Sequence, residues 1–353
     1  MRDLFNCLDS RLRGNDGAFR IQAMIPKLLA HLSTAIHDAT HRPFKLRNST
    51  PVGGGSINEA YRLEASDGSR YFLKLNDAQH LAMFVAEAAG LDAIAATNTI
   101  RVPRPIAHGS AYGHSYLVLE HLELNSRGDA KLLGEQLAAL HRCTSPPLPC
   151  RERAGVRVDT SHFHTSTLSL QRGGNSDTSS RFGFAQDNFI GTTMQPNGWT
   201  NNWIDFWREQ RLGFQLRLAA QNGYGGELQR LGTKLLDELP AFFTGHTPQP
   251  SLLHGDLWNG NHAFLADGTP TIFDPATYYG DRECDLAMTE LFSGYAANFY
   301  TAYRASYPLD AGYATRRDLY NLYHILNHAN LFGGGYARQA EQMVQRLLAK
   351  VAR

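Results

Sequence analysis

Two short stretches near the start of the chain alternate apolar and polar residues. Residues 60–65 and 70–75 show this alternation, and Asp67-Gly68 lies between them. An Asp-Gly pair between two alternating stretches is a strong short signal for a β-hairpin. The pattern therefore predicts two antiparallel strands joined by a tight turn.

The next two elements show a different apolar spacing. Residues 77–96 repeat apolar side chains at intervals of three and four, with Phe84, Leu91 and Ile94 on one stripe, which is typical of a helix packed on a core. Residues 116–122 are a nearly continuous apolar run with a polar end, which indicates a buried strand. With the hairpin, these elements predict a small β-rich lobe with one helix.

Helical periodicity dominates the rest of the chain. The expected helices cover residues 131–142, 203–221, 227–239, 285–302, 318–331 and 337–352. A chain of 353 residues is longer than a typical single domain. We therefore expect an α+β fold with a smaller lobe at residues 24–121 and a larger helical lobe at residues 122–353.

Two segments do not fit either lobe. Residues 1–23 are polar and glycine-rich without an apolar period, and residues 145–180 are rich in Pro, Arg, Ser, Thr and Gly. Such compositions bury too little apolar surface to offset chain entropy. We expect a disordered insertion at 145–180. The first segment is either a disordered arm or an extension from a start codon upstream of the native Met24.

The strongest chemical signal is the spacing of three polar residues. Asn261 lies five residues after Asp256, and Asp274 lies thirteen residues after Asn261. An Asp-Gly turn at Asp267-Gly268 predicts a hairpin that returns Asp274 to the side of Asn261. Phosphoryl transfer needs a base at the incoming hydroxyl and oxygen ligands for magnesium. We therefore predict Asp256 as the catalytic base and Asn261 and Asp274 as metal ligands for Mg²⁺.

A second half of such a site is predicted upstream. A glycine-rich loop precedes the first strand and consists of Gly53, Gly54, Gly55 and Ser56. Glycine lets backbone amides approach phosphate oxygens, although three glycines alone are more often a flexible loop. Lys74 lies on the second strand and Glu87 on the apolar stripe of the helix, where a carboxylate needs a partner. We expect these groups to position the phosphates of ATP, and the strand end at Glu120, His121 and Leu122 to face the adenine.

Several motifs together resemble the fructosamine or ketosamine kinase family, within the aminoglycoside- and choline-kinase-like phosphotransferases. They are Gly53-Gly54-Gly55-Ser56-Ile57-Asn58, Phe84-Val85-Ala86-Glu87-Ala88, Asn188-Phe189-Ile190-Gly191-Thr192-Thr193, His254-Gly255-Asp256-Leu257-Trp258-Asn259-Gly260-Asn261 and Phe273-Asp274-Pro275-Ala276-Thr277-Tyr278-Tyr279-Gly280-Asp281-Arg282-Glu283. The resemblance implies a two-lobed protein-kinase-like fold. It also implies ATP-dependent phosphorylation of the sugar 3-hydroxyl of a ketosamine, with ribulosamine or erythrulosamine adducts favoured over fructosamines, in deglycation.

The resemblance leaves the substrate residues less defined. Aromatic residues that could wall a sugar-amine pocket are Trp199, Trp258, Tyr278 and Tyr279, although such aromatics more often belong to the core. Asp281, Arg282 and Asp285 match the family pattern, and two roles stay open for them: ion pairs that brace the catalytic loop, or contacts to substrate. Two other functions are also open, a small-molecule phosphotransferase of the aminoglycoside or choline kinase type and a non-catalytic nucleotide-binding relative.

Composition limits the partners. A formal net charge of +1 gives no basic field for nucleic acid. No apolar stretch reaches membrane-spanning length, and the four cysteines form no Cys-x-x-Cys pair. We expect a cytoplasmic protein, monomeric with a dimer left open, whose partner is a small-molecule or protein-bound ketosamine.

Overall fold

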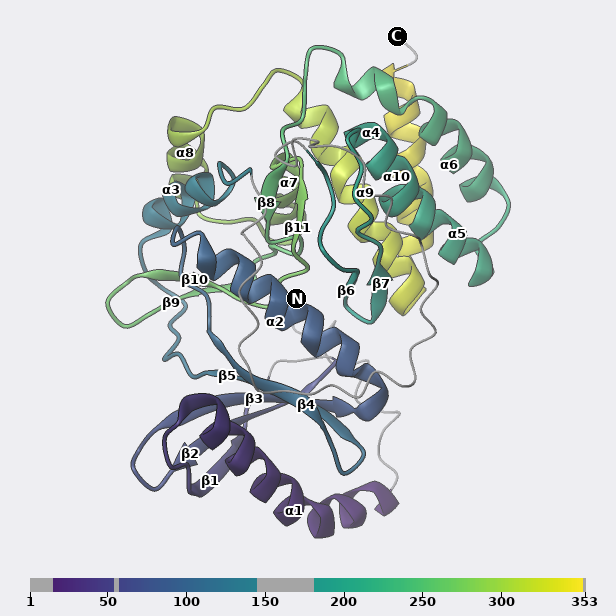
Figure 1. Cartoon of the computed structure of the whole chain (residues 1–353). Coiled ribbons are helices and arrows are strands. Elements are labelled where there is room, and N and C mark those ends of the chain that lie inside the picture. Colours follow the sequence, from purple (N-terminus) through teal and green to yellow (C-terminus); the bar gives the residue numbers. More distant parts are fainter. Residues whose placement is uncertain (1–14, 54–56, 145–180, 352–353) are drawn as a thin grey trace, which may run out of the picture. The chain divides into compact units, whose positions relative to one another are not determined.

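The computed structural model describes residues 15–53, 57–144 and 181–351 (Figure 1). The chain divides into two compact units. The first contains the residues up to Val85 together with Pro105–His121, and the second contains Ala86–Arg104 and the residues from Leu122 onward. The chain passes from the first unit to the second between His121 and Leu122, and residues 86–104, predicted in the smaller lobe, group with the second unit.

A five-stranded antiparallel sheet forms the first unit. The strand order is β1-β2-β3-β5-β4, and the strands are β1 (Leu46–Pro51), β2 (Glu59–Ala65), β3 (Arg70–Asp77), β4 (Pro105–Ala111) and β5 (His114–Glu120). The predicted hairpin is present, because β2 pairs with β3 around the turn at Gly68, which has φ +85°. Lys74 on β3 lies opposite Ala60 on one side and Leu117 on the other.

A long helix, α1 (Asn15–Thr40), supplies the core of this sheet. Leu28, Leu32 and Ile36 belong to one buried cluster with side chains of β2, β3 and β5. Their spacing of four places them on one helix face. Residues 15–23, expected as part of a disordered extension, belong to α1, and residues 1–14 lie outside the described part. A helix can continue past the position where apolar periodicity begins, as here before the internal Pro26.

The boundary between the units falls within α2 (Leu81–Ala96), just after Val85. The later part of α2 packs on the second unit, since a Cβ on Gly90 would lie 2.9 Å from the Thr277 hydroxyl oxygen. The carbonyl of Arg101 accepts a hydrogen bond from the Ile272 backbone N–H at 3.0 Å. These contacts explain why residues 86–104 leave the predicted smaller lobe.

The second unit is mainly helical (Figure 1). Its helices are α3 (Ala130–Leu140), α4 (Trp203–Phe206), a π-helical segment (Trp207–Leu212), α5 (Gly213–Gln221), α6 (Glu227–Asp237), α7 (Glu283–Leu291), α8 (Ala297–Ser306), α9 (Tyr313–Phe332) and α10 (Tyr336–Val351). Helix α9 packs against α5, α7 and α10, and α3 packs against α8. None of the helices in the described ranges is long and apolar enough to cross a membrane.

One predicted helix is wrong in its extent. Residues 285–302 were expected to form one helix, but α7 ends at Leu291 and α8 begins at Ala297. Ser293 and Gly294 have φ values of +63° and +69°, and this left-handed backbone interrupts a right-handed helix. Apolar residues on both sides of the break continued the helical period in the sequence. Periodicity alone therefore did not reveal the break.

Short two-stranded pairs complete the second unit. Strand β8 (Ser251–Leu253) pairs with β11 (Tyr278–Gly280), β9 (His262–Phe264) with β10 (Pro270–Ile272), and β6 (Asn188–Ile190) with β7 (Thr193–Gln195). The segment from β8 to β9 carries the predicted base. The segment from β10 to β11 carries Asp274. Both lie within the second unit.

Candidate active site

The β9–β10 hairpin joins the two predicted metal ligands. His262 pairs with Ile272, and the next rung is a hydrogen bond from the Phe273 N–H to the Asn261 carbonyl at 3.1 Å. Asp274 follows immediately, with φ +59°. A left-handed backbone at a residue other than glycine is uncommon and often marks a functional site. The hairpin expected from the Asp-Gly turn is thus confirmed.

Asn261 is tied to the predicted base. Its side-chain Nδ2 donates to the Asp256 carbonyl at 2.8 Å and to Asp256 Oδ2 at 3.3 Å. The amide nitrogen is therefore committed to Asp256. The amide oxygen is the atom of Asn261 that suits a cation, since Mg²⁺ prefers oxygen ligands.

His254 links the loop of Asp256 to the segment of Asp274. Its Nε2 donates to the Phe273 carbonyl at 2.9 Å, and its Nδ1 accepts from the Asp256 N–H at 3.2 Å. Burial lowers the pKa of His254 despite the opposing charge of Asp285, so the ring is neutral and can fill both roles. His254 was not among the predicted site residues, although it stands within the motif that was singled out.

The glycine beside His254 is required by the turn. Gly255 has φ +84°, and a Cβ there would overlap the carbonyl oxygen of Ala276. That segment is held close by a hydrogen bond of 2.8 Å from the Ala276 N–H to the His254 carbonyl. Only glycine fits this close approach of two backbones.

Asp285, on the first turn of α7, braces the same loop from the other side. It accepts from the His254 N–H at 2.7 Å and from the Gly255 N–H at 2.8 Å. His141 Nε2 lies 3.1 Å from Asp285 Oδ2, and His141 Nδ1 lies 2.8 Å from the Tyr303 hydroxyl. Burial alone would raise the pKa of Asp285, but the hydrogen bond and charge of His141 and the backbone donors hold it below its ordinary value. Of the two roles left open for Asp285, the contacts favour bracing.

The electrostatics of Asp256 suit a cation site. Burial and the charge of nearby Asp274 raise the pKa of Asp256 to about 7, against the opposing effect of the Asn261 hydrogen bond. Two carboxylates that repel each other favour a bound cation, which would return Asp256 to its ionised form. Together with the Asn261 amide oxygen, Asp274 supplies the hard oxygen donors that Mg²⁺ requires. The donor set therefore fits magnesium.

The predicted nucleotide residues lie mostly in the first unit. Lys74 on β3 is buried, with 6% of its surface exposed, and Glu87 lies on α2. Glu120 ends β5 and is followed by His121 and Leu122. Gly53 follows β1, whereas Gly54, Gly55 and Ser56 lie outside the described residues. The pairing of Lys74 with Glu87 and the contacts to ATP stay predictions.

Trp258 is the exposed member of the predicted substrate set. Its surface is 36% exposed, two residues from Asp256. The indole covers Gly260, where a Cβ would overlap the ring. The Tyr295 hydroxyl donates to the Trp258 carbonyl at 3.2 Å. Trp258 thus offers a partly exposed aromatic surface two residues after the predicted base.

The other predicted substrate residues are interior. Tyr278, Tyr279, Asp281 and Arg282 are all at most 7% exposed. The guanidinium of Arg211 lies 4.0 Å from the Tyr278 ring centre, and that of Arg282 lies 3.6 Å from the Tyr307 ring centre. Because these side chains are occupied by contacts within the protein, we keep the substrate prediction for Trp258 alone.

Comparison with known proteins identifies the family of this chain. The family model for fructosamine kinase matches residues 28–169 and 158–350. The chain belongs to the fructosamine kinase family. It is 47% identical over 320 residues to a probable ketoamine kinase of Synechocystis sp., covering 90% of this chain and 96% of that one. It is 40% identical over 299 residues to the chloroplastic protein-ribulosamine 3-kinase of Arabidopsis thaliana, covering 84% of this chain and 81% of that protein.

Solved structures agree with the fold of this kinase family. One from Haemophilus somnus 129PT, whose proposed identity is a fructosamine-3-kinase, has a TM-score of 0.74 at 27% identity and covers 90% of this chain and 96% of that chain. The amicoumacin kinase hAmiN has a TM-score of 0.53 at 13% identity over 94% of this chain and 96% of that one, which shows the fold alone. The fold is that of the protein-kinase-like phosphotransferases, as the motifs implied.

Proposed function

We propose that this kinase transfers the γ-phosphoryl group of Mg-ATP to the sugar 3-hydroxyl of a ketosamine. The observation that carries the proposal is the joining of Asp256, Asn261 and Asp274 by one hairpin and one hydrogen-bonded loop. A base beside two oxygen ligands for a cation is the arrangement that phosphoryl transfer to an alcohol needs. Family membership supports the sugar alcohol as acceptor.

Each residue has a separate role in the proposed reaction. Asp256 accepts the proton of the attacking hydroxyl, since it is partly exposed beside the exposed Trp258. Asn261 and Asp274 would hold Mg²⁺, which would neutralise charge on the phosphates. Asp285 and His254 keep the Asp256 backbone in place through the hydrogen bonds described above.

The nucleotide would be bound by Lys74, Glu87, the backbone of Glu120, His121 and Leu122, and the glycine-rich loop. Lys74 would reach the α- and β-phosphates and Glu87 would orient it, as in other kinase-like enzymes. The backbone of Glu120, His121 and Leu122 would face adenine, and the glycine-rich loop at residues 53–56 would cover the phosphates. Spacing and family membership support these roles.

The proposed substrate is a free or protein-bound ketosamine, and ribulosamine adducts are the first candidates. The relative in Arabidopsis named protein-ribulosamine 3-kinase supports this choice. Trp258 offers an aromatic surface on which a sugar ring could pack beside Asp256. Phosphorylation at the 3-hydroxyl would then serve deglycation, by making the adduct labile.

An acceptor panel tests the proposal. Purified protein is incubated with Mg-ATP and ribulose-, erythrulose- and fructose-lysine adducts, with an aminoglycoside and choline as alternative acceptors, and ADP release is followed. We expect turnover of at least one ketosamine, with ³¹P NMR placing the phosphate on the 3-oxygen. Turnover of an aminoglycoside or choline without any ketosamine would overturn the proposal. ATP binding without turnover of any acceptor would favour a non-catalytic relative.

A further inference from the structure

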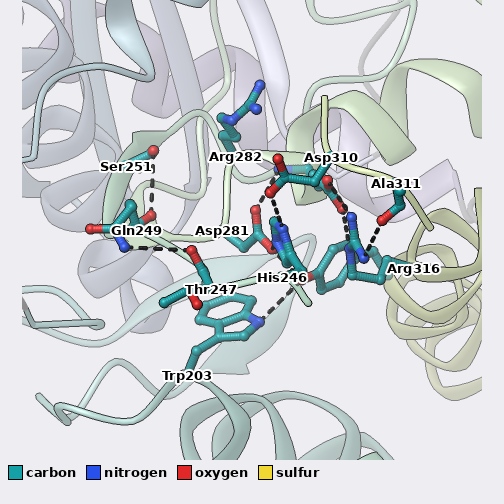
Figure 2. Close-up of polar contacts among 12 residues, drawn as sticks. Trp203, His246, Thr247, Gln249, Ser251, Asp281, Arg282, Asp310, Ala311 and Arg316 are labelled. Atoms are coloured by element: carbon teal, nitrogen blue, oxygen red, sulfur yellow. Dashed lines mark hydrogen bonds and ion pairs between the residues drawn. The ribbon is translucent and has the colours of Figure 1, made fainter. Parts of the chain in front are cut away.

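A second polar cluster lies outside the catalytic loop, around His246 (Figure 2). Its Nε2 lies 2.8 Å from Asp281 Oδ2, and its Nδ1 lies 2.6 Å from Asp310 Oδ2. The Tyr320 hydroxyl donates to the same Asp281 oxygen at 2.6 Å, and Trp203 Nε1 donates to Tyr320 at 3.1 Å. His246 therefore bridges the segment after β11 to the segment between α8 and α9.

The two carboxylates define the charge of His246. A neutral imidazole has one N–H, whereas an imidazolium has two. Both ring nitrogens of His246 face carboxylate oxygens, so donation to both requires the protonated ring. Burial alone would lower the pKa of His246, but the hydrogen bond and charge of Asp281, the charge of Glu283 and the hydrogen bond to Asp310 hold it above its ordinary value.

The cluster is a hydrogen-bonded clamp rather than a metal site. His246, Asp281 and Glu283 lie close enough to hold a cation. Both Glu283 oxygens, however, accept from the Arg316 guanidinium, at 2.7 Å and 2.9 Å. Both nitrogens of His246 are also engaged. The charged groups of the cluster are therefore already paired with one another, and a metal ion would have to displace these contacts.

The clamp connects to the catalytic loop through α7. Asp281 Oδ1 accepts from the Glu283 N–H at 3.0 Å, and the Asp281 carbonyl accepts from the Cys284 N–H at 2.9 Å. These bonds fix the first turn of α7, which carries Asp285. Asp285 in turn holds the N–H groups of His254 and Gly255, directly before Asp256.

We propose that His246, as an imidazolium between Asp281 and Asp310, is a positioning residue that aligns Asp256 through the first turn of α7. The proposal rests on the proposed function only in assigning Asp256 as the base. Loss of the second N–H would release one carboxylate and loosen the turn that carries Asp285. A small misplacement of a base can lower the rate of phosphoryl transfer strongly and weaken substrate binding much less.

The clamp has a defined pH dependence. Its folded-state pKa lies above the ordinary value of about 6.5, so its stabilisation is complete below that pH and is lost as the pH rises through the folded-state pKa. The charged and titratable groups that surround it are Asp281, Asp310, Glu283, Arg282, Arg316 and Tyr320. Arg282 donates to the carbonyls of Tyr307 and Pro308, and Arg316 is paired with Glu283. Asp281 and Asp310 are the carboxylates in direct contact with the ring.

Two variants test the clamp by kinetics. In His246→Gln the amide replaces the imidazolium without charge, and we expect kcat to fall roughly tenfold while KM changes less than about twofold. In the wild type, kcat should fall at alkaline pH as the His246 ring loses its second proton. This fall should be absent from His246→Gln. Asp310→Asn keeps the His246 ring but removes one of the two carboxylates that raise its pKa, so the alkaline fall of kcat should move to lower pH. Asp205→Asn, which breaks an exposed ion pair with Arg208, is the matched control and should leave the profile unchanged.

A second measurement is independent of the acceptor. NMR titration of the His246 ring, without substrate, should give a pKa above 6.5 that falls in Asp310→Asn. Amide exchange at Gly255 should become faster in His246→Gln.

A wild-type kcat and pH profile in His246→Gln, or an unshifted ring pKa in Asp310→Asn, would overturn the inference. If no ketosamine is turned over, the proposed function fails, and these two measurements still decide whether the clamp exists. If His246→Gln does not fold, the half-exposed Asp310→Asn carries the test.

Discussion

Asp256 shows at the scale of one residue how function can cost stability. It lies partly buried beside Asp274, and both burial and this neighbouring charge oppose its ionisation. The unfolded chain ionises Asp near pH 4, so the folded protein loses stability relative to the unfolded chain as pH rises from about 4 to about 7. A bound cation would offset this loss, which is a physical reason for a base to lie next to metal ligands.

Asp256→Asn should separate these two effects. We expect kcat to fall by at least roughly 10²-fold, because the amide cannot accept the hydroxyl proton. In EDTA at pH 8 the variant should be more stable by about 1 kcal/mol, a figure reduced for partial exposure. Urea denaturation at pH 5 and pH 8 measures this, and the gain should be smaller at pH 5. Wild-type turnover would refute Asp256 as the base, and an equal gain at both pH values would refute the electrostatic cause.

Helix α7 connects elements far apart in sequence. Asp285, on its first turn, accepts a hydrogen bond from the loop that carries Asp256. Asp285 also contacts His141, the residue that directly follows α3. The hairpin β9–β10 was predictable, because its turn and both strands lie within a dozen residues. The bracing of the loop was not, since His141 and Asp285 are 144 residues apart. No local pattern relates such positions.

Asp285→Asn tests this role of α7. The amide keeps the shape but offers one acceptor oxygen, so either the His254 or the Gly255 N–H loses its partner. A buried N–H without a partner costs about 1–3 kcal/mol, so the free energy of unfolding should fall by that amount. We expect kcat to fall as well, with a smaller change in KM for ATP. Urea denaturation and steady-state kinetics measure both, and Asp237→Asn on the exposed end of α6 is a control. Unchanged stability and kcat would show that the loop does not depend on α7.

At the scale of the whole molecule, the chain forms a sheet unit and a helical unit, and the proposed base and metal ligands all belong to the helical unit. The proposed ATP contacts at Lys74 and Glu120 belong to the sheet unit. A ligand that binds the folded chain and not the unfolded chain stabilises it by linkage, by about 2.7 kcal/mol at a concentration of 100 Kd. Both the metal and the nucleotide should therefore raise Tm together.

Thermal unfolding with the non-hydrolysable analogue AMP-PNP tests this expectation. We expect a larger rise in Tm with AMP-PNP and Mg²⁺ together than with either alone. Asp274→Asn should remove most of the increment due to Mg²⁺ while leaving part of the nucleotide effect. Lys74→Ala should reduce the nucleotide effect itself. If Asp274→Asn responds to Mg²⁺ as the wild type does, Asp274 is not a metal ligand.

The sequence by itself determined the hairpins and the family, because these depend on residues close together along the chain. It also gave the order of the proposed base and metal ligands. It also indicated most helices, but not the break at Ser293, where a left-handed backbone follows an uninterrupted apolar period. Tertiary structure decided which polar residues support the site. His246 and its partner Asp310 are 64 residues apart, and Gly255 and its partner Asp285 are 30 apart. Such pairs form only when packing brings distant segments together, and burial then fixes their charge.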